Sequence, residues 1–226
     1  QPHSWFSHLI AQSSELMTAK QDRATLLKAG LPELGSVLRE LIDNADQHAV
    51  TDVAGIKYKK ALRGTSIKLN RISRKDALAY SDREPELARF ILKLFLKSET
   101  LDFLEISVID SGPGLARRWL TAKEGRPVDS LEKLDFEDEL RATLDCFRSH
   151  ITSKPDSGAS GMGLYLALQA LNKLKAYVRV RTGRLSLNQA FQGSSGMMEF
   201  EPSARGIKER LVAAEGTVFT ICIPVG

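Results

Sequence analysis

Two polar side chains one helical turn apart, Glu40 and Asn44, are the first residues of this sequence that could carry out chemistry. Positions four apart lie side by side on one face of a helix. An amide oxygen can bind Mg²⁺ together with water and phosphate oxygens, and a carboxylate one turn earlier could deprotonate an attacking water. The pair therefore fits a metal ligand beside a general base. It also fits the solvated face of an ordinary amphipathic helix.

A carboxylate followed by two glycines forms the second candidate group. Asp110 ends an apolar segment over 103–109, and Gly112 and Gly114 come directly after it. Glycines allow a tight turn and the close approach of a ligand. A carboxylate there can accept the amino hydrogens of adenine, whereas guanine presents a carbonyl at that edge and is repelled. The pattern therefore predicts an adenine site, with a plain Asp-Ser-Gly-Pro turn as the alternative.

The third group is a set of glycines at the start of a predicted helix. Gly158, Gly161 and Gly163 precede and open a helix expected over Leu164–Leu174, and Lys154 lies just upstream. Free main-chain N–H groups and the helix dipole favour anions at such an end. The pattern of a Walker-type loop is not found. The segment thus predicts a phosphate site, although glycines can also simply loosen a helix start.

Hydrophobic periodicity indicates the elements that must position these groups. Apolar residues recur every three or four positions from Leu31 to about His48, behind a proline, and predict a helix that carries Glu40 and Asn44. The other expected elements are helices over Glu84–Lys97 and near Phe136–Phe147, and strands over Ser66–Asn70, Phe103–Ile109, Tyr177–Arg181, Leu185–Ala190, Met197–Phe200 and Val218–Ile223.

This mixture of helices and strands predicts the α/β class, as a two-layer sandwich of a mixed sheet with helices on one face. We expect an N-terminal helical segment packed on the core over 1–30 and one domain over 31–226. Within that domain, 55–98 is expected to be a basic insertion. The loose pattern over 116–160 predicts a long lid.

Composition sets few further limits. The chain has 226 residues, 42% of them hydrophobic, and a formal net charge of +4. No apolar run approaches the roughly 18 residues of a membrane span, and no signal peptide is visible. The two cysteines, Cys146 and Cys222, have no metal-site spacing and are interpreted as ordinary thiols of a reducing, cytoplasmic compartment. Because the sequence starts at Gln1 without Met and stops shortly after a predicted strand, we expect a domain of a longer protein.

In order and content, the motifs resemble those of the GHKL superfamily of ATP-binding domains, which share the Bergerat fold. This group contains gyrase-type topoisomerases, ninety-kilodalton heat-shock chaperones, mismatch-repair ATPases and sensor histidine kinases. Glu40-Leu-Ile-Asp-Asn44-Ala45 looks like the N-box, and Asp110-Ser-Gly112-Pro-Gly114 like the first glycine box. Gly161-Met-Gly163-Leu164 is similar to the second glycine box, and 216–224 to the closing strand of the kinases.

The resemblance implies that ATP and Mg²⁺ are bound and that a lid covers them. Carried over residue by residue, it implies nucleotide contacts from Asn44 (also the Mg²⁺ ligand), His48, Asp110, Gly112, Gly114, Lys154, Ser160, Gly161, Met162, Gly163, Leu164 and Thr217, with Glu40 as the general base. The sequence departs from the family in the long stretch between Asn44 and Asp110 and in the long hairpin region over 183–215.

Three functions remain open at this stage. The domain could hydrolyse ATP as a conformational switch, or transfer the γ-phosphate to another domain as histidine kinases do. It could also be an ATP-gated binding module with little catalysis, with a protein or a nucleic acid as partner. The nucleic-acid hypothesis depends on eight basic residues without an intervening acid: Lys57, Lys59, Lys60, Arg63, Lys68, Arg71, Arg74 and Lys75.

Overall fold

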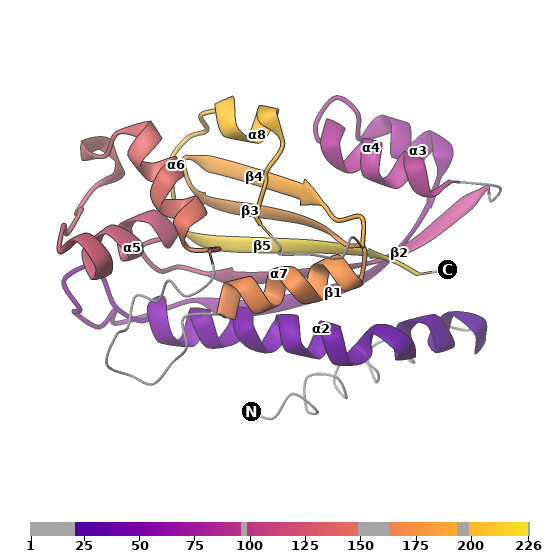
Figure 1. The fold of residues 1–226 in the computed structure, drawn as a ribbon, viewed down its shortest axis with the longest axis horizontal. Coiled ribbons are helices and arrows are strands. Elements are labelled where there is room, and N and C mark those ends of the chain that lie inside the picture. Colours follow the sequence, from indigo (N-terminus) through magenta and orange to yellow (C-terminus); the bar gives the residue numbers. More distant parts are fainter. Residues whose placement is uncertain (1–20, 96–98, 149–162, 194–198, 226) are drawn as a thin grey trace.

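A five-stranded sheet in the order β1-β2-β5-β3-β4 forms the centre of the computed structural model, which describes residues 21–95, 99–148, 163–193 and 199–225 (Figure 1). The strands are β1 (Arg63–Ser73), β2 (Thr100–Asp110), β3 (Tyr177–Gly183), β4 (Leu185–Ala190) and β5 (Ala214–Pro224). The helical elements are α2 (Gln21–His48), α3 (Arg74–Ala79), α4 (Pro85–Leu94), α5 (Leu115–Glu124), the 3-10 turn η1 (Leu131–Lys133), α6 (Phe136–Asp145), α7 (Gly163–Lys173) and α8 (Ala204–Lys208).

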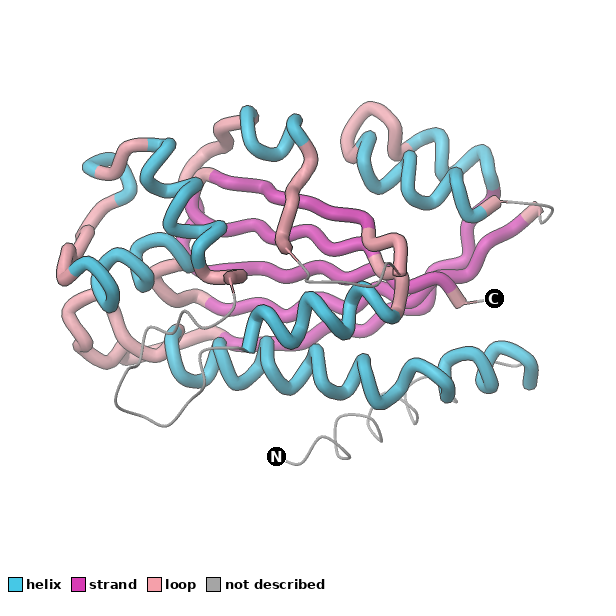
Figure 2. The backbone as a smooth tube through the Cα atoms, in the orientation of Figure 1, coloured by secondary structure: helices cyan, strands magenta, loops and turns pink. Residues whose placement is uncertain are grey.

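All four strand pairings in the described part of the chain are antiparallel, so the prediction of a mixed sheet is wrong. The connection through α7 does return β3 parallel to β2, as in a βαβ unit. However, β5 inserts between these two strands and runs antiparallel to both (Figure 1). Figure 2 shows the strands side by side in one sheet. A parallel neighbour is thereby avoided although the local order of elements suggested one.

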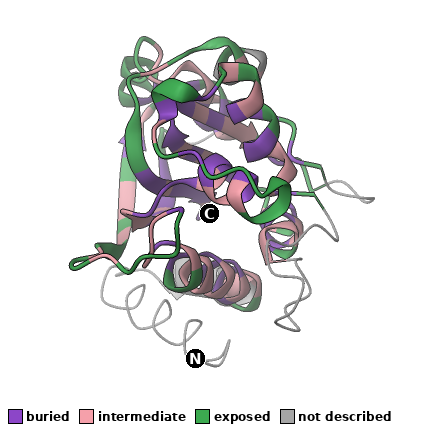
Figure 3. Cartoon of the chain, turned by 90° about the vertical axis from the view of Figure 1, so that its left-hand side faces the viewer, coloured by how far each residue is buried: buried purple, intermediate pink, exposed green. Residues whose placement is uncertain are grey.

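The main hydrophobic core lies between one face of the sheet and the helices α2, α6 and α7. Alternate residues of the central strands point into it, such as Ile106 of β2 and Ile221 of β5, which are paired and fully buried. Leu38 of α2 and Leu168 of α7 close the core from the helix side. Figure 3 looks along this layer and shows the buried residues between helices and strands.

The predicted start of the first helix at Leu31 is wrong. In the structure α2 is already helical at Gln21 and runs through Pro32 without interruption, ending at His48 as expected. The boundary drawn at residue 30 therefore coincides with no break in this helix. The N-terminal segment before Gln21 lies outside the described residues.

A second, smaller core covers the opposite face of the sheet at the end far from α5. There Phe90 and Ile91 of α4 pack over Phe103, Tyr177 and Cys222, which alternate with residues of the main core. The prediction of helices on one face thus holds for α2, α6 and α7 but not for α3 and α4. Part of the expected insertion over 55–98 is therefore a layer of the fold.

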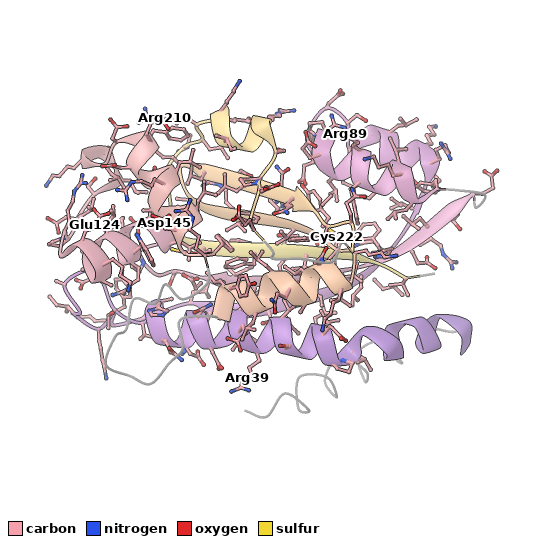
Figure 4. The ribbon with its side chains drawn as sticks, in the orientation of Figure 1. Arg39, Arg89, Glu124, Asp145, Arg210 and Cys222 are labelled. Carbon is pink, nitrogen blue, oxygen red and sulfur yellow. The ribbon has the colours of Figure 1, made fainter. Side chains whose placement is uncertain are left out.

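The first two thirds of the predicted lid form a packed helical unit. From 115 to 145, α5, η1 and α6 surround an apolar cluster that includes Trp119, Leu120 and Leu131. Arg141 of α6 also donates to Glu124 of α5 at 3.0 Å; Glu124 is labelled in Figure 4. The helix predicted near Phe136–Phe147 is present as α6, whereas the loose sequence pattern concealed α5 and η1. The rest of the predicted lid, over 149–160, lies outside the described residues.

Two smaller expectations can be compared with the structure. Of the strand predicted over Met197–Phe200, the first two residues lie outside the described residues, and the other two, Glu199 and Phe200, belong to no strand. Instead, Phe200 stacks on Phe147, with ring centroids 4.3 Å apart.

Cys146 and Cys222 are free thiols, as predicted, and burial raises the pKa of Cys222 to about 12. Within the described residues, no helix is long and apolar enough to cross a membrane.

Candidate functional site

Three polar side chains stand in a row across neighbouring strands at the end of the sheet that faces α5. Asp110 of β2 pairs with Thr217 of β5, which in turn pairs with Thr182 of β3. The alternation of side chains places all three on the face of the main core, the face covered by α2 and α7. The structure thus brings Asp110 and Thr217 together, as predicted, and adds Thr182.

The carboxylate of Asp110 accepts hydrogen bonds from main-chain N–H groups of its own turn and of β5. The N–H of Gly112 donates to Asp110 Oδ1 at 2.8 Å. Burial raises the pKa of Asp110 above its usual value, and the main-chain hydrogen bonds from Gly112 and Thr217 oppose that rise. Raised carboxylate pKa values are common where a buried acid serves a ligand.

Glycines let three backbone segments meet around this carboxylate. A β-carbon on Gly112 would lie 2.6 Å from Cα of Ala49, the residue after α2, so no larger residue fits. Gly114 has φ +83° and begins α5, while Gly216 has φ +81° and passes directly against the main chain of Asp110. The glycine turn is therefore packed against both the end of α2 and the start of β5.

Thr182 is a residue of the site that the sequence analysis missed. Its hydroxyl accepts the first N–H of α5, from Leu115, at 3.2 Å, and donates to the carbonyl of Gly216 at 3.3 Å. It also lies 3.5 Å from the hydroxyl of Thr217. Only the strand register reveals this position, because nothing in the local sequence around Thr182 distinguishes it.

Glu40 and Asn44 of α2 lie against the start of α7. A β-carbon on Gly163 would lie 2.7 Å from Glu40 Oε2 and 3.9 Å from Asn44 Nδ2. Asn44 Nδ2 is buried and has no hydrogen-bond partner in the described part of the chain. Because buried amides are normally satisfied, this group points to a missing ligand. Turning the amide over would present its oxygen to a cation instead.

The remaining predicted site residues fall into two groups. His48 ends α2 and is half-buried, and Leu164 is partly buried against the main core. Four others lie outside the described residues, so their predicted contacts stay predictions: Lys154, Ser160, Gly161 and Met162.

Two adjacent arginines of α5, which the sequence analysis did not single out, hold the surroundings of the site. Arg117 is buried and donates to both carboxylate oxygens of Glu215 at 2.9 Å, next to Gly216. Arg118 instead reaches the main-chain carbonyls of His48 and Thr51 at the end of α2. Their position directly after the glycine turn is the one sequence signal that could have drawn attention to them.

The basic stretch contains fewer available cations than its sequence suggested. Arg63 pairs with Asp46, Lys68 lies 3.6 Å from Glu105, and Arg71 pairs with Asp102 at 2.8 Å. Arg74 donates to the carbonyl of Phe95. Half of the eight basic residues thus have partners inside the domain, which weakens the nucleic-acid hypothesis without testing it.

Comparison with known proteins adds no family to these observations. No protein-family model matches the sequence, and no curated protein matches it either. The function must therefore be argued from the geometry of the site.

Proposed function

We propose that this domain binds ATP with Mg²⁺ between the Asp110 end of the sheet, the C-terminal half of α2 and the start of α7, and that it hydrolyses the nucleotide. One observation carries the proposal. The half-buried carboxylate of Asp110, in a glycine turn, lies on the face of the sheet that α2 covers, and Asn44 Nδ2 of α2, next to the start of α7, is buried without a hydrogen-bond partner among the described residues. These are the groups that adenine and a metal-bound phosphate require.

The adenine end of the proposal depends on Asp110. As an ionised acceptor, Asp110 suits the exocyclic amino group of adenine and repels the carbonyl of guanine. Thr217 and Thr182 supply hydroxyls next to it in the same row. The tight glycine contacts with Ala49 and the start of β5 leave the turn little freedom to accommodate a different base.

The phosphate end depends on α2 and α7. Mg²⁺ commonly binds through one or two protein oxygens, several waters and the phosphates of its substrate, so the Asn44 amide oxygen is a sufficient protein contribution. The first N–H groups of α7 and the dipole of this 11-residue helix favour a phosphate there. Glu40, one turn before Asn44, is placed to orient and deprotonate water.

Titration calorimetry with ATP and GTP, with and without Mg²⁺, tests the binding. We expect the wild type to prefer ATP, and Asp110→Asn to lose roughly 10- to 150-fold in affinity, since a hydrogen bond to a charged group contributes about 1.5–3 kcal/mol. In Asn44→Ala, Mg²⁺ should no longer increase the affinity for ATP. The exposed Asp82→Asn is the matched control. Equal ATP affinity in the wild type and Asp110→Asn would overturn the proposal.

A further inference from the structure

One side chain connects the two ends of the candidate site. Nη2 of Arg118, the fourth residue of α5, donates to the carbonyl oxygens of His48 at 2.8 Å and Thr51 at 2.6 Å. The last carbonyls of a helix have no partner within the helix, and a cation is favoured at that end by the dipole. Arg118 therefore caps α2, the helix that carries Glu40 and Asn44.

The backbone of Arg118 belongs to the opposite end of the site. Its N–H bonds the carbonyl of Gly114 at 3.3 Å, so it lies in the first turn of α5, immediately after the turn that follows Asp110. Between the two ends, Gly112 is in direct contact with Ala49. The guanidinium of Arg118 and the contact between Gly112 and Ala49 therefore both connect the glycine turn to the end of α2.

Arg118 is held in a costly position. Its Nε is buried and has no hydrogen-bond partner among the described residues, and burial lowers the pKa of the guanidinium. Apolar packing could join α5 to α2 without burying a charge. Unlike apolar packing, hydrogen bonds to two carbonyls define both the distance and the orientation of α5 relative to the end of α2.

The neighbouring arginine provides an internal comparison. Arg117 donates to the carbonyls of Val128 and Asp129 and to the carboxylate of Glu215. It therefore connects α5 to the segment after it and to the start of β5, and among the described residues its side chain makes no hydrogen bond to α2. The two residues differ in which part of the site they hold in place, although they are adjacent and of the same type.

We propose that Arg118 is a positioning residue that fixes the separation between Asp110 and Asn44, so that adenine and the metal-bound phosphates are recognised as one ligand. This inference rests on the proposed function. It assigns to Arg118 no contact with the nucleotide, and it predicts an effect on the coupling between the two ends of the site with little effect on either end alone.

The test compares three probes on four proteins. Affinities for adenosine, for inorganic tripolyphosphate with Mg²⁺, and for ATP with Mg²⁺ are measured by calorimetry. The proteins are the wild type, Arg118→Met, Arg118→Lys and Arg117→Met. Thermal melting establishes that each is folded, and the lysine variant keeps the charge if the methionine variant does not fold.

We expect Arg118→Met to keep its affinity for adenosine and for tripolyphosphate, and to lose about tenfold or more in affinity for MgATP, within the usual range of coupling between sites. Arg118→Lys should be intermediate, because a lysine can reach one carbonyl but lacks the fork of a guanidinium. Arg117→Met should change adenosine and MgATP affinity by the same factor.

Two results would overturn the inference. An unchanged ratio of MgATP to adenosine affinity in Arg118→Met would show that Arg118 does not couple the two ends. An equal fall of that ratio in Arg117→Met would show that any loosening of α5 suffices. A wild type that binds neither adenosine nor MgATP would instead remove the proposed function, and this inference with it.

Discussion

The Asp110 end and the Asn44 end of the candidate site, which are the proposed adenine end and phosphate end, differ in how far the protein satisfies its own polar groups. At the adenine end, Asp110 accepts an N–H from Gly112, and Thr182 bridges Leu115 and Gly216. At the phosphate end, the Asn44 amide is buried without a partner in the described part of the chain. At the first end the groups nearest Asp110 have partners within the protein, although Arg118 Nε does not among the described residues, whereas at the second end the unpartnered group is the Asn44 amide itself.

This difference suggests that the two ends have different roles in ligand binding. A rigid, satisfied surface recognises a base at low entropic cost, because few groups must be ordered on binding. An end with unpartnered donors and acceptors gains its hydrogen bonds only when phosphates and a cation arrive. We therefore expect substitutions at the adenine end to affect both stability and binding, and substitutions at the phosphate end to affect chemistry and metal dependence.

The largest effect is expected from Glu40→Gln, at the phosphate end. If Glu40 deprotonates the attacking water, ATP turnover should fall by about 100-fold or more, the usual contribution of a general base. The affinity for MgATP should change little, because the amide keeps the shape of the side chain. Phosphate release under saturating ATP measures the first quantity, and calorimetry measures the second.

The matched control is Asp43→Asn on the same helix. Asp43 pairs with Arg39 at 3.4 Å, and Arg39 points away from the sheet in Figure 4. The Asp43→Asn substitution therefore removes one carboxylate from α2 without changing a residue of the candidate site. An undiminished rate in Glu40→Gln would exclude Glu40 as the base. Label from the γ-phosphate that stays on a protein partner would favour phosphotransfer over hydrolysis.

The next effect is expected from Gly112→Ala, at the adenine end. The new methyl would lie 2.6 Å from Cα and 2.8 Å from Cβ of Ala49, so the turn and α2 must move apart. Overpacking of this kind costs about 1–3 kcal/mol in unfolding free energy, and ATP affinity should fall with it. Urea denaturation and calorimetry measure the two losses.

Gly64→Ala is the control for that substitution. No atom lies within 4 Å of a β-carbon at Gly64 in β1, and its φ is not positive. Its unfolding free energy should therefore stay close to that of the wild type. If Gly112→Ala were equally silent, the contact between the glycine turn and α2 would not be as tight as the structure has it, and the adenine end would not be rigid.

Whether a feature of the candidate site could be predicted from the sequence depends on how far apart in the chain its interacting residues lie. The spacing of Glu40 and Asn44 and the turn after Asp110 are local, and both occur where periodicity and glycine placed them. Thr182 could not be found, because it enters the site through the pairing of β3 with β5, two strands more than thirty residues apart.

The fold shows the same limit. The insertion of β5 between β2 and β3 decides that the sheet is antiparallel, and this is a property of the whole chain that no local pattern contains. Similarly, Glu139 belongs to a run of mostly acidic residues over 135–139, and nothing in that run distinguishes it from its acidic neighbours. In the structure it is buried against Arg184, whose N–H and Nε both donate to it. A buried ion pair between residues far apart in the chain cannot be predicted until the positions of both partners in the fold are known.

The smallest expected effect is the dependence on pH, and it separates the two roles of Asp110. Burial raises its pKa above the ordinary 3.8, so its contribution to folding is most favourable when the carboxyl is neutral. That contribution is fully present below pH 3.8 and is lost as pH rises through the higher pKa of the folded state. Adenine binding has the opposite sign, since it needs the ionised acceptor.

Urea denaturation and calorimetry of the wild type and Asp110→Asn between about pH 3.5 and 7 measure both signs. Other carboxyl groups titrate in both proteins, so their effects cancel in the difference. The unfolding free energy of the wild type relative to Asp110→Asn should fall as pH rises, while ATP affinity of the wild type should rise over the same range. If both quantities rose together, the carboxylate would be stabilised by its own turn, and the adenine end would be adapted to its charge before any base binds.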